Sequence, residues 1–323
     1  MKTNTRRDFL KTTLALGATA TLAAPALRTL AASKPAKTTP ASTAKTPATT
    51  AATPDVVAIK GGTRAAMLDR AIAELGGIAA FVKKGQKVVI KPNIGWDRDP
   101  DLCANTHPDI IARLVALCLG AGASEVSVFD HTCHPWEKCY KNSGIADAVK
   151  TAGGRMLPGN DESYYREVKV PGGVTLTTVQ IHKAVLDSDV FINVPVLKVH
   201  GGGKITACMK NLMGMIWDRK FYHKNDLHQC IVDVLHAKKP DLNILDAYSP
   251  MMRNGPQGKS SEDLLTDTKT LLASRDIVAI DAAGAKILGK TPDDIGHIRI
   301  AAESGFGRID LEKLNIARIK MTA

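Results

Sequence analysis

The stretch "KVVIKPNIGWDRDPDLCANTHPDIIARLVALCLGAGASEVSVFD", residues 87–130, decides the fold class of this chain. It opens with an apolar segment, 87–93, that predicts a strand ending at Pro92, because proline lacks the N–H that a ladder needs. Residues 107–123 then show helical spacing of apolar side chains, with a proline in the first turn and glycine near the end. A second apolar strand follows at 125–130. This strand–helix–strand order is typical of a βαβ unit and therefore predicts a parallel sheet.

The same alternation continues on both sides of this unit. We expect further strands at 56–59, 189–199 and 241–247, and helices at 65–75, 144–154, 226–238, 274–289 and 294–305. One departure is 167–181, which predicts a two-stranded antiparallel excursion around Pro171-Gly172-Gly173. Hydrophobic residues make up 44% of the chain and aromatic residues 4%, so we expect an aliphatic core, as in buried parallel sheets. The predicted fold is α/β and Rossmann-like: a mostly parallel sheet with helices on both faces and a small antiparallel β excursion.

The N-terminus has the features of an export signal. Arg6-Arg7 is followed by Phe9-Leu10-Lys11 and a weakly apolar run with small residues near its end, which resembles a twin-arginine (Tat) signal. We therefore expect a Tat signal peptide over 1–32, the Tat translocase as a partner during export, and a periplasmic or other extracytoplasmic location. The alternative is a retained membrane anchor. Pro25 interrupts the run, which is shorter than the roughly 20 apolar residues of a span, so we expect no stable membrane span after cleavage.

A low-complexity segment separates this signal from the folded part. Residues 33–54 consist mostly of Thr, Ala, Pro and Lys and predict a flexible linker, which places the α/β domain at 55–323. The formal net charge of the chain is +11, but residues 1–54 hold eight Lys or Arg and one Asp. The remainder has 35 basic and 31 acidic residues, a net charge of +4. We therefore expect no nucleic acid as a partner.

Polar residues follow the apolar runs at four predicted strand ends. Ligands of open parallel sheets bind outside the carboxyl ends of the strands, so these residues are candidates for one crevice site. They are Lys91 and Asn93, Asp130 and His131, Lys198 and His200, and Asp246.

The segment "VPVLKVHGGGKITACMKNLMG", residues 194–214, is the strongest of these candidates. Gly201, Gly202 and Gly203 allow close approach to a ligand or a positive φ, and a helix starting near Thr206 would offer free N–H groups to an anion. Thr206 and Lys210 would then lie one turn apart on one helix face. The glycine spacing does not match a phosphate-binding Walker A loop.

Histidine and cysteine leave several hypotheses open. The set of His131, Cys133 and His134, or the pair of His223 and His228, could bind a soft or borderline metal, although no spacing is diagnostic. The six cysteines contain no CxxC and no ferredoxin-type run, so the chain shows no iron–sulfur motif. Cys133 and Cys139 either form a disulfide or remain thiols. The absence of a GxSxG elbow argues against a common hydrolase triad.

Taken together, these motifs resemble the domain of unknown function 362 family. The blocks that carry the resemblance occur in family order: "VVIKPNIG" (88–95), "THPDIIARLVALCLGAGASEVSVFD" (106–130), "INVPVLKVH" (192–200), "TACMKNLMG" (206–214), the downstream His223, "KPDLNILDAYSPMMRNGPQG" (239–258) and "SRDIVAIDAAGAKILG" (274–289). The resemblance implies no settled reaction. Many members carry a fused ferredoxin module, which implies a redox partner here. His107 and Asp281 enter the candidate site through this resemblance, since they match the family by position.

The favoured hypothesis is an exported enzyme with a crevice for a small anionic ligand and a cofactor that is unknown, with a divalent metal as one candidate. The expected catalytic residues are His200, His223, Lys198 and Lys210. The expected ligand-binding residues are Lys91, Asn93, His107, Gly201, Gly202, Gly203, Thr206 and Asn211. Asp130, Asp246 and Asp281 are the candidate ligands of the divalent cation. Alternatives are a non-catalytic periplasmic ligand- or metal-binding protein and an accessory protein to an iron–sulfur redox partner.

Overall fold

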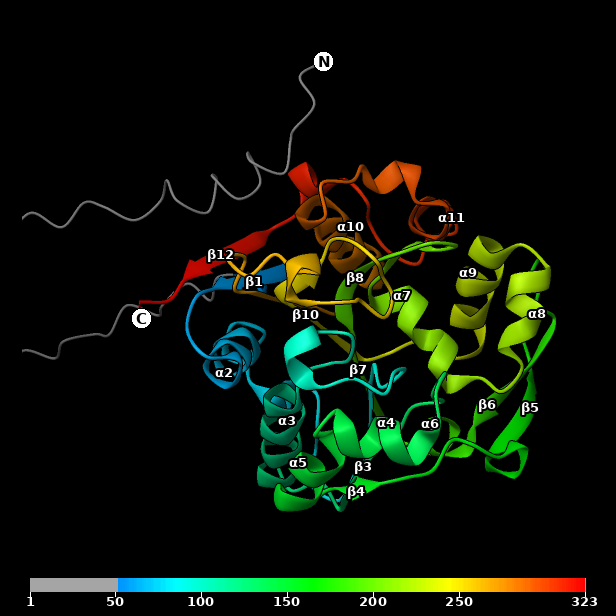
Figure 1. Cartoon of the computed structure of the whole chain (residues 1–323), viewed down its shortest axis with the longest axis horizontal. Helices are drawn as coiled ribbons and strands as arrows, with labels where there is room; N and C mark the ends of the chain where they lie inside the picture. Colours follow the sequence, from blue (N-terminus) through cyan, green and yellow to red (C-terminus); the bar gives the residue numbers. More distant parts are fainter. Residues whose placement is uncertain (1–51, 323) are drawn as a thin grey trace, which may run out of the picture.

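The computed structural model describes residues 52–322 (Figure 1). Its main element is a ten-stranded sheet in the order β12-β1-β11-β10-β7-β2-β3-β4, with β8 beside β10 and β9 beside β8. The strands are β1 (Val56–Lys60), β2 (Lys87–Pro92), β3 (Glu125–Val128), β4 (Arg155–Met156), β7 (Val190–Val194), β8 (Val196–His200), β9 (Lys204–Thr206), β10 (Leu242–Met251), β11 (Thr270–Ser274) and β12 (Ile316–Lys320). Most pairs are parallel, whereas β11 is antiparallel to β1 and β10, and β9 to β8.

Two apolar cores lie on opposite faces of this sheet. Along β2, Val88 and Ile90 join one core while Val89 joins the other, because successive strand side chains point to opposite faces. Figure 1 shows α2, α3 and α5 on one side of the sheet and α9, α10 and α11 on the other. The helices are α2 (Arg64–Glu74), α3 (Pro108–Gly120), α4 (Trp136–Asn142), α5 (Ile145–Thr151), α6 (Lys183–Leu186), α7 (Cys208–Asn211), α8 (Arg219–Lys224), α9 (Leu227–Ala237), α10 (Ile277–Ile287) and α11 (Gly296–Glu303). The predicted α/β fold is confirmed.

The antiparallel excursion forms a separate two-stranded sheet. Strands β5 (Tyr165–Lys169) and β6 (Thr178–His182) pair in register from Tyr165 with His182 to Lys169 with Thr178. Their apolar side packs on the core that α9 and α10 also cover, through Val179 and Ile181.

The predicted strand at 189–199 is wrong as a single strand. Pro195 divides it into β7 and β8, since proline cannot donate to the ladder. Strand β8 pairs with β10 at one side and turns back on β9 at the other, so Lys198 lies opposite Thr206. Thr206 therefore ends a strand, and the predicted helix begins later, at Cys208.

Asp55 links the start of β1 to the C-terminal part of the chain. Its carboxylate accepts a hydrogen bond of 2.9 Å from the Asn315 backbone N–H and pairs with Arg308, and its carbonyl accepts one from the Ser274 hydroxyl. The predicted signal peptide and most of the predicted linker lie outside the described residues. In the part of the chain that is described, no helix combines the length and apolar character that a membrane span requires.

Candidate functional site

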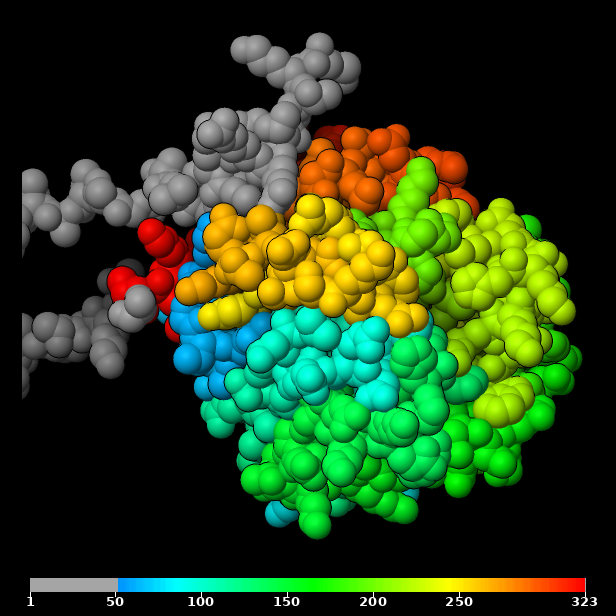
Figure 2. All heavy atoms as spheres, in the orientation of Figure 1, coloured from blue at the N-terminus to red at the C-terminus, as the bar shows by residue number. Residues whose placement is uncertain are grey.

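Polar side chains from several strand ends surround a pocket of about 430 Å³. Eleven of the residues selected from the sequence line it: Lys91, Asn93, Asp130, His131, Cys133, Lys198, His200, Thr206, Lys210, Asn211 and His223. Figure 2 shows a face on which the segment near residue 100, in cyan, meets the segment near residue 255, in yellow to orange. Trp96 and Pro256, from these parts of the chain, also line the pocket. The carboxyl ends of β2, β3 and β8 thus meet at one site.

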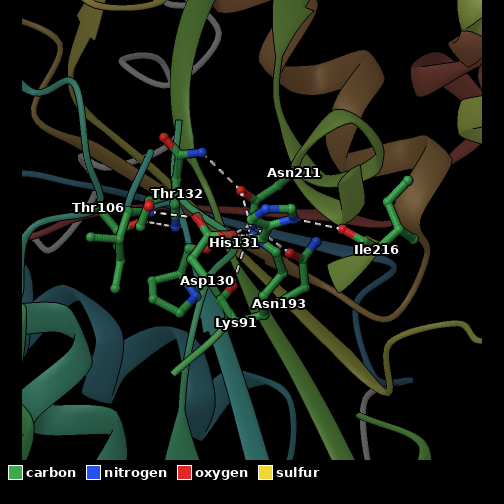
Figure 3. Close-up of polar contacts among 12 residues, drawn as sticks. Lys91, Thr106, Asp130, His131, Thr132, Asn193, Asn211 and Ile216 are labelled. Carbon is green, nitrogen blue, oxygen red and sulfur yellow. Dashed lines mark hydrogen bonds and ion pairs between the residues drawn. The ribbon is translucent and has the colours of Figure 1, made fainter. Parts of the chain in front are cut away.

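A buried ion pair forms the floor of the pocket (Figure 3). Lys91 Nζ lies 2.8 Å from Asp130 Oδ1, and both side chains are buried. The second carboxylate oxygen of Asp130 accepts a 2.7 Å hydrogen bond from the Ile94 backbone N–H. Burial lowers the pKa of Lys91, and the adjacent carboxylate counteracts this effect. Asp130 therefore neutralises Lys91 and contributes little net charge to the pocket.

Amide side chains link this floor to the neighbouring strands. Asn211 Oδ1 accepts hydrogen bonds from Lys91 Nζ at 3.2 Å and from Asn93 Nδ2 at 3.1 Å. Its Nδ2 donates to Asn193 Oδ1 at 2.9 Å, and Asn193 in turn donates to Asn243 Oδ1 at 3.0 Å. A connected network of this kind fixes the side chains around the pocket before any ligand arrives.

Gly214 covers the ion pair from above. A Cβ built at this position would lie 1.8 Å from Asp130 Oδ1 and 2.6 Å from Lys91 Nζ, distances that real atoms do not tolerate. Its carbonyl also accepts a 3.0 Å hydrogen bond from the His131 backbone N–H. The 3-10 helix η4 (Leu212–Met215) can therefore close over the floor only with glycine here.

Lys198 is held on the wall of the pocket. Its Nζ donates hydrogen bonds to Asn93 Oδ1 at 2.8 Å and to the Ala104 carbonyl at 2.6 Å. These two bonds leave one remaining position on the nitrogen, a third N–H in the ammonium form or a lone pair in the amine form. The pKa of Lys198 is lowered to about 7, chiefly by burial and in part by the nearby charge of Lys210. The amine thus exchanges its proton near neutral pH.

Lys210 has no comparable partners. Its side chain is nine-tenths buried and lines the pocket, yet within residues 52–322 its Nζ makes no hydrogen bond or ion pair. Burial lowers the pKa of Lys210 to about 8. Arg219 and Lys220, from the start of α8, add two more positive charges to the same wall.

The two histidines expected to act in catalysis lie on the same pocket. Burial lowers the pKa of His200 to about 3, and the positive charges of Lys210 and Lys198 add to this effect. The pKa of the exposed His223 is also lowered, chiefly by burial and then by Lys210. His200 is therefore a neutral imidazole at neutral pH, and its Nδ1 lies 3.4 Å from the Gly203 backbone N–H.

The expectation for the glycine run is corrected in two respects. None of Gly201, Gly202 and Gly203 has a positive φ; the left-handed residue is Lys204, at φ 61°. Gly201 lines a separate cavity of about 690 Å³, while a Cβ at Gly203 would meet Lys210 Cε at 3.1 Å. Glycine at position 203 therefore leaves room for the side chain of Lys210.

The predicted anion site at the helix after the glycine run is already filled. Asp281 of α10 accepts hydrogen bonds from the backbone N–H groups of Cys208 at 2.6 Å and Met209 at 3.0 Å, at the start of α7. Burial raises the pKa of Asp281 to about 7, against the effect of these two bonds. The protein's own carboxyl group thus occupies the place that we expected a ligand to take.

The three aspartates proposed as metal ligands do not share a site. Asp130 binds Lys91 and Asp281 binds α7, whereas Asp246 pairs with Arg64 at 3.7 Å and accepts from the His107 backbone N–H at 3.3 Å. His107 caps α3 and does not line the pocket. Across residues 52–322, no group of three or more His, Cys, Asp or Glu is arranged to hold a metal ion. The donor set does not fit the proposed cation.

The remaining histidines and cysteines also separate. Cys133 and Cys139 are free thiols, Cys133 exposed and Cys139 buried. The ring of His131 stacks on Trp217 at 5.0 Å, and its Nδ1 lies 2.9 Å from the Ile216 carbonyl. His228 Nδ1 lies 3.1 Å from His297 Nδ1 rather than beside His223. Neither histidine pair forms the suggested metal site.

Several lining residues were not selected from the sequence as ligand or catalytic residues. They are Gly95, Trp96, Met213, Gly214, Arg219, Lys220 and Pro256. The basic pair Arg219-Lys220 lies four and three residues before His223, so its position beside a candidate catalytic residue was a signal that could have found it. Trp96 comes from a loop after β2, for which strand-end reasoning gives no position.

Comparison with family models confirms both resemblances. The model described as "Domain of unknown function (DUF362)" matches residues 88–286, and a model of the twin-arginine translocation signal sequence matches residues 3–23. The signal directs Tat-dependent export to the periplasm or another extracytoplasmic space, and the Tat translocase is the partner during that step.

Individual relatives are distant. A thylakoid-associated protein of Synechocystis sp. is 26% identical over 250 residues, which cover 72% of this chain and 73% of the relative. The lactate racemase apoprotein of Thermoanaerobacterium thermosaccharolyticum gives a TM-score of 0.46 at 11% identity, covering 71% of this chain and 56% of that one. A Thermotoga maritima protein gives 0.45 at 10% identity, covering 76% of this chain and 60% of that one.

Proposed function

This chain belongs to the domain of unknown function 362 family. From that premise we propose that it is an exported enzyme that binds a small anion among its pocket lysines. In this proposal Lys198 transfers a proton to or from the bound anion. The observation that carries this proposal is the charge of the pocket. The positive groups are Lys91, Lys198, Lys210, Arg219 and Lys220. Among the described lining residues the single carboxylate is Asp130, which Lys91 neutralises.

Burial makes this charge useful for binding. Lys198 and Lys210 lose hydration in the folded protein, and neither forms an ion pair with a carboxylate of the described residues; burial is the largest cause of their lowered pKa values and, for Lys198, outweighs the opposing charge of Asp130. An anion in the pocket would supply the missing partner and raise both pKa values again. Binding at pH 8 should therefore take up protons from solution, and affinity should increase as pH falls from 8.5 to 6.5.

The same groups suggest which residue moves protons. General acid–base catalysis is most efficient when the catalytic pKa is near the working pH, and Lys198 at about 7 meets this condition. His200 at about 3 does not, so its role in this proposal is a hydrogen bond to the substrate as a neutral ring. Lys198 was expected among the catalytic residues together with His200 and His223, and this proposal assigns the proton transfer to it.

Ligand-induced thermal stabilisation tests the binding step. Inorganic phosphate, sulfate and citrate should stabilise the wild type, whereas Lys210→Met should lose most of this effect. Lys150→Met, on the exposed surface of α5, is the matched control and should respond like the wild type. Equal stabilisation of the wild type and Lys210→Met would contradict the proposal.

Turnover separates the enzyme from a binding protein that uses the same pocket. Any anion that binds is incubated with the wild type and Lys198→Met, and products are measured by mass spectrometry. Turnover by the wild type and none by a Lys198→Met variant that still binds the anion supports catalysis. Binding without turnover by the wild type across a library of anionic metabolites supports the non-catalytic alternative.

A further inference from the structure

We propose that Cys133 is the nucleophile of this pocket and that its substrates are small anions with an electrophilic carbonyl carbon. This inference rests on the proposed function, because it assigns a substrate class to the same anion site.

The position of the thiol is fixed by Arg219. Arg219 Nη1 donates to the His131 carbonyl at 2.9 Å and Nη2 to the Thr132 carbonyl at 2.8 Å. The same Nη1 lies 3.3 Å from Cys133 Sγ, and the Cys133 backbone N–H donates to the Gly95 carbonyl at 2.9 Å. The thiol is thus held beside a guanidinium on the wall of the pocket. Reactive cysteines are found in such electropositive, partly exposed surroundings.

Cys133 differs from every other cysteine of the chain. Five of the six are buried, and Cys133 alone is exposed. None of the six is in a disulfide, although the protein is exported to a compartment where disulfides form readily. An exposed, unpaired thiol in such a protein indicates a role for the thiol itself.

Lys210 provides an independent indication of a ligand at the thiol. It lines the same pocket, is nine-tenths buried, and its Nζ has no hydrogen-bond or ion-pair partner in the part of the chain that the structure describes. A buried ammonium left without a partner is costly unless an anion binds to it.

The number of cations favours a carbonyl compound. One carboxylate would engage Arg219 and Lys220, which leaves Lys210 and Lys198 without an anion. When the Cys133 thiol releases its proton to solvent and the sulfur adds to a carbonyl carbon, a C–S bond forms and the π electron pair of the C=O bond moves to oxygen. The oxygen then takes a proton from the Lys210 ammonium and becomes the hydroxyl of a thiohemiacetal. Positive N–H donors aimed at such a developing charge stabilise its formation.

Charge-selective alkylation tests the nucleophile. Iodoacetate and iodoacetamide react with a thiol in the same way, but only iodoacetate is an anion. Relative to glutathione, Cys133 should prefer iodoacetate over iodoacetamide by about tenfold, because the cationic pocket concentrates the anion. Peptide mapping should place the label on Cys133. The preference should fall toward the glutathione value in Lys210→Met and persist in Lys150→Met; no preference in the wild type would overturn the proposal.

Paired probes of equal charge test the carbonyl. Glyoxylate has a carbonyl carbon and glycolate lacks it, so the wild type should bind glyoxylate at least about tenfold more tightly, since a covalent bond adds to the ion pairs. Cys133→Ser keeps the His131 and Thr132 carbonyls that hold Arg219 in place. This variant should bind glyoxylate and glycolate with equal affinity. A glyoxylate preference that survives in Cys133→Ser would assign the adduct to a lysine and overturn the proposal. If neither glycolate nor phosphate binds the wild type, the proposed anion site is wrong. If both bind and Cys133→Ser leaves the affinity for glyoxylate unchanged, the anion site stands and only the assignment of Cys133 as the nucleophile is wrong.

Discussion

The buried amine of Lys210 lowers the stability of the folded protein and, in the proposed function, provides a charge that binds the ligand. Its pKa, lowered from 10.5 to about 8, corresponds to an upper limit of about 3 kcal/mol of unfavourable folding free energy. Lys210→Met keeps most of the buried chain and removes the charge, so we expect the ligand-free variant to be more stable than the wild type by about 1–3 kcal/mol at pH 7. Urea denaturation measures this difference.

The matched comparison for this variant is Lys91→Met, which removes the partner of a buried carboxylate. Because Asp130 would then be left unpaired, Lys91→Met should be destabilised by about 3–5 kcal/mol. Destabilisation of both variants by similar amounts would mean that Lys210 has a partner that compensates its burial.

Gly214 is a second residue at which a single added atom, a Cβ, would disturb the buried ion pair of Lys91 and Asp130. Gly214→Ala would place a Cβ where Asp130 Oδ1 now lies, so η4 or the ion pair must move. We expect a loss of about 3 kcal/mol or more in the free energy of unfolding and loss of anion binding. Gly120→Ala is the control: it ends α3 with open space around the added Cβ and should be neutral or slightly stabilising. Similar denaturation midpoints for the two variants would refute this account of Gly214.

At the scale of elements, α7 depends on a carboxyl group from another helix. Its first N–H groups, on Cys208 and Met209, are buried and bind Asp281 of α10. Asp281→Ala would leave both without a partner, at a cost of about 2–4 kcal/mol. Because Lys210 and Asn211 follow on α7, we also expect weaker phosphate binding, measured by calorimetry on the folded fraction. Unchanged stability would show that solvent can satisfy these groups.

Some elements were predictable from sequence and others were not. The βαβ unit at 87–130 was predictable, because its apolar residues recur with strand and helix spacing and proline and glycine mark the ends of its elements, which are local signals in the sequence. Strands β11 and β12 were missed. The apolar run of β11, Thr270–Ser274, leads directly into α10, and β12 is an edge strand with partly exposed side chains, so neither shows a distinct period in the sequence.

The candidate site shows the same division. Strand-end reasoning located Lys91, Asn93, Asp130, Lys198 and His200 on one pocket, because carboxyl ends of parallel strands converge. It placed Asp246 there wrongly, since β10 continues to Met251 and Asp246 therefore lies within the strand rather than at its carboxyl end. It missed Arg219 and Cys133, which come from α8 and a loop. Their position depends on tertiary packing and on the hydrogen bonds from Arg219 to Cys133 Sγ and to the Thr132 carbonyl, which the linear sequence does not contain.

For the whole molecule, the buried ionisable groups predict how stability depends on pH. Lys198 and Lys210 have folded pKa values of about 7 and 8, below the value near 10.4 expected for an unfolded lysine. Between these limits the unfolded chain binds more protons, so their contribution to stability rises with pH. Asp281 acts in the opposite direction at lower pH: its pKa is raised from 3.8 to about 7, so its contribution falls as pH rises from 4 to 7. His182, His200 and His297 oppose Asp281 in that range, because their pKa values are lowered to about 4, 3 and 3 and the unfolded chain therefore binds more protons below pH 6.5. Above pH 7 the two lysines remain, and they predict stability that rises with pH.

Urea denaturation between pH 7 and 8.5 tests this prediction. Over this range the two lysines should raise the free energy of unfolding of the ligand-free wild type by about 2 kcal/mol. The Lys198→Met/Lys210→Met double variant should lack the rise. The range stops at pH 8.5 because the buried thiols of Cys118 and Cys139, with pKa values raised to about 12 and 11, oppose the lysines at higher pH. Saturating phosphate should flatten the wild-type curve, since a bound anion keeps both ammonium groups charged in the folded protein. A rise that persists in the double variant would mean that other groups control stability in this range.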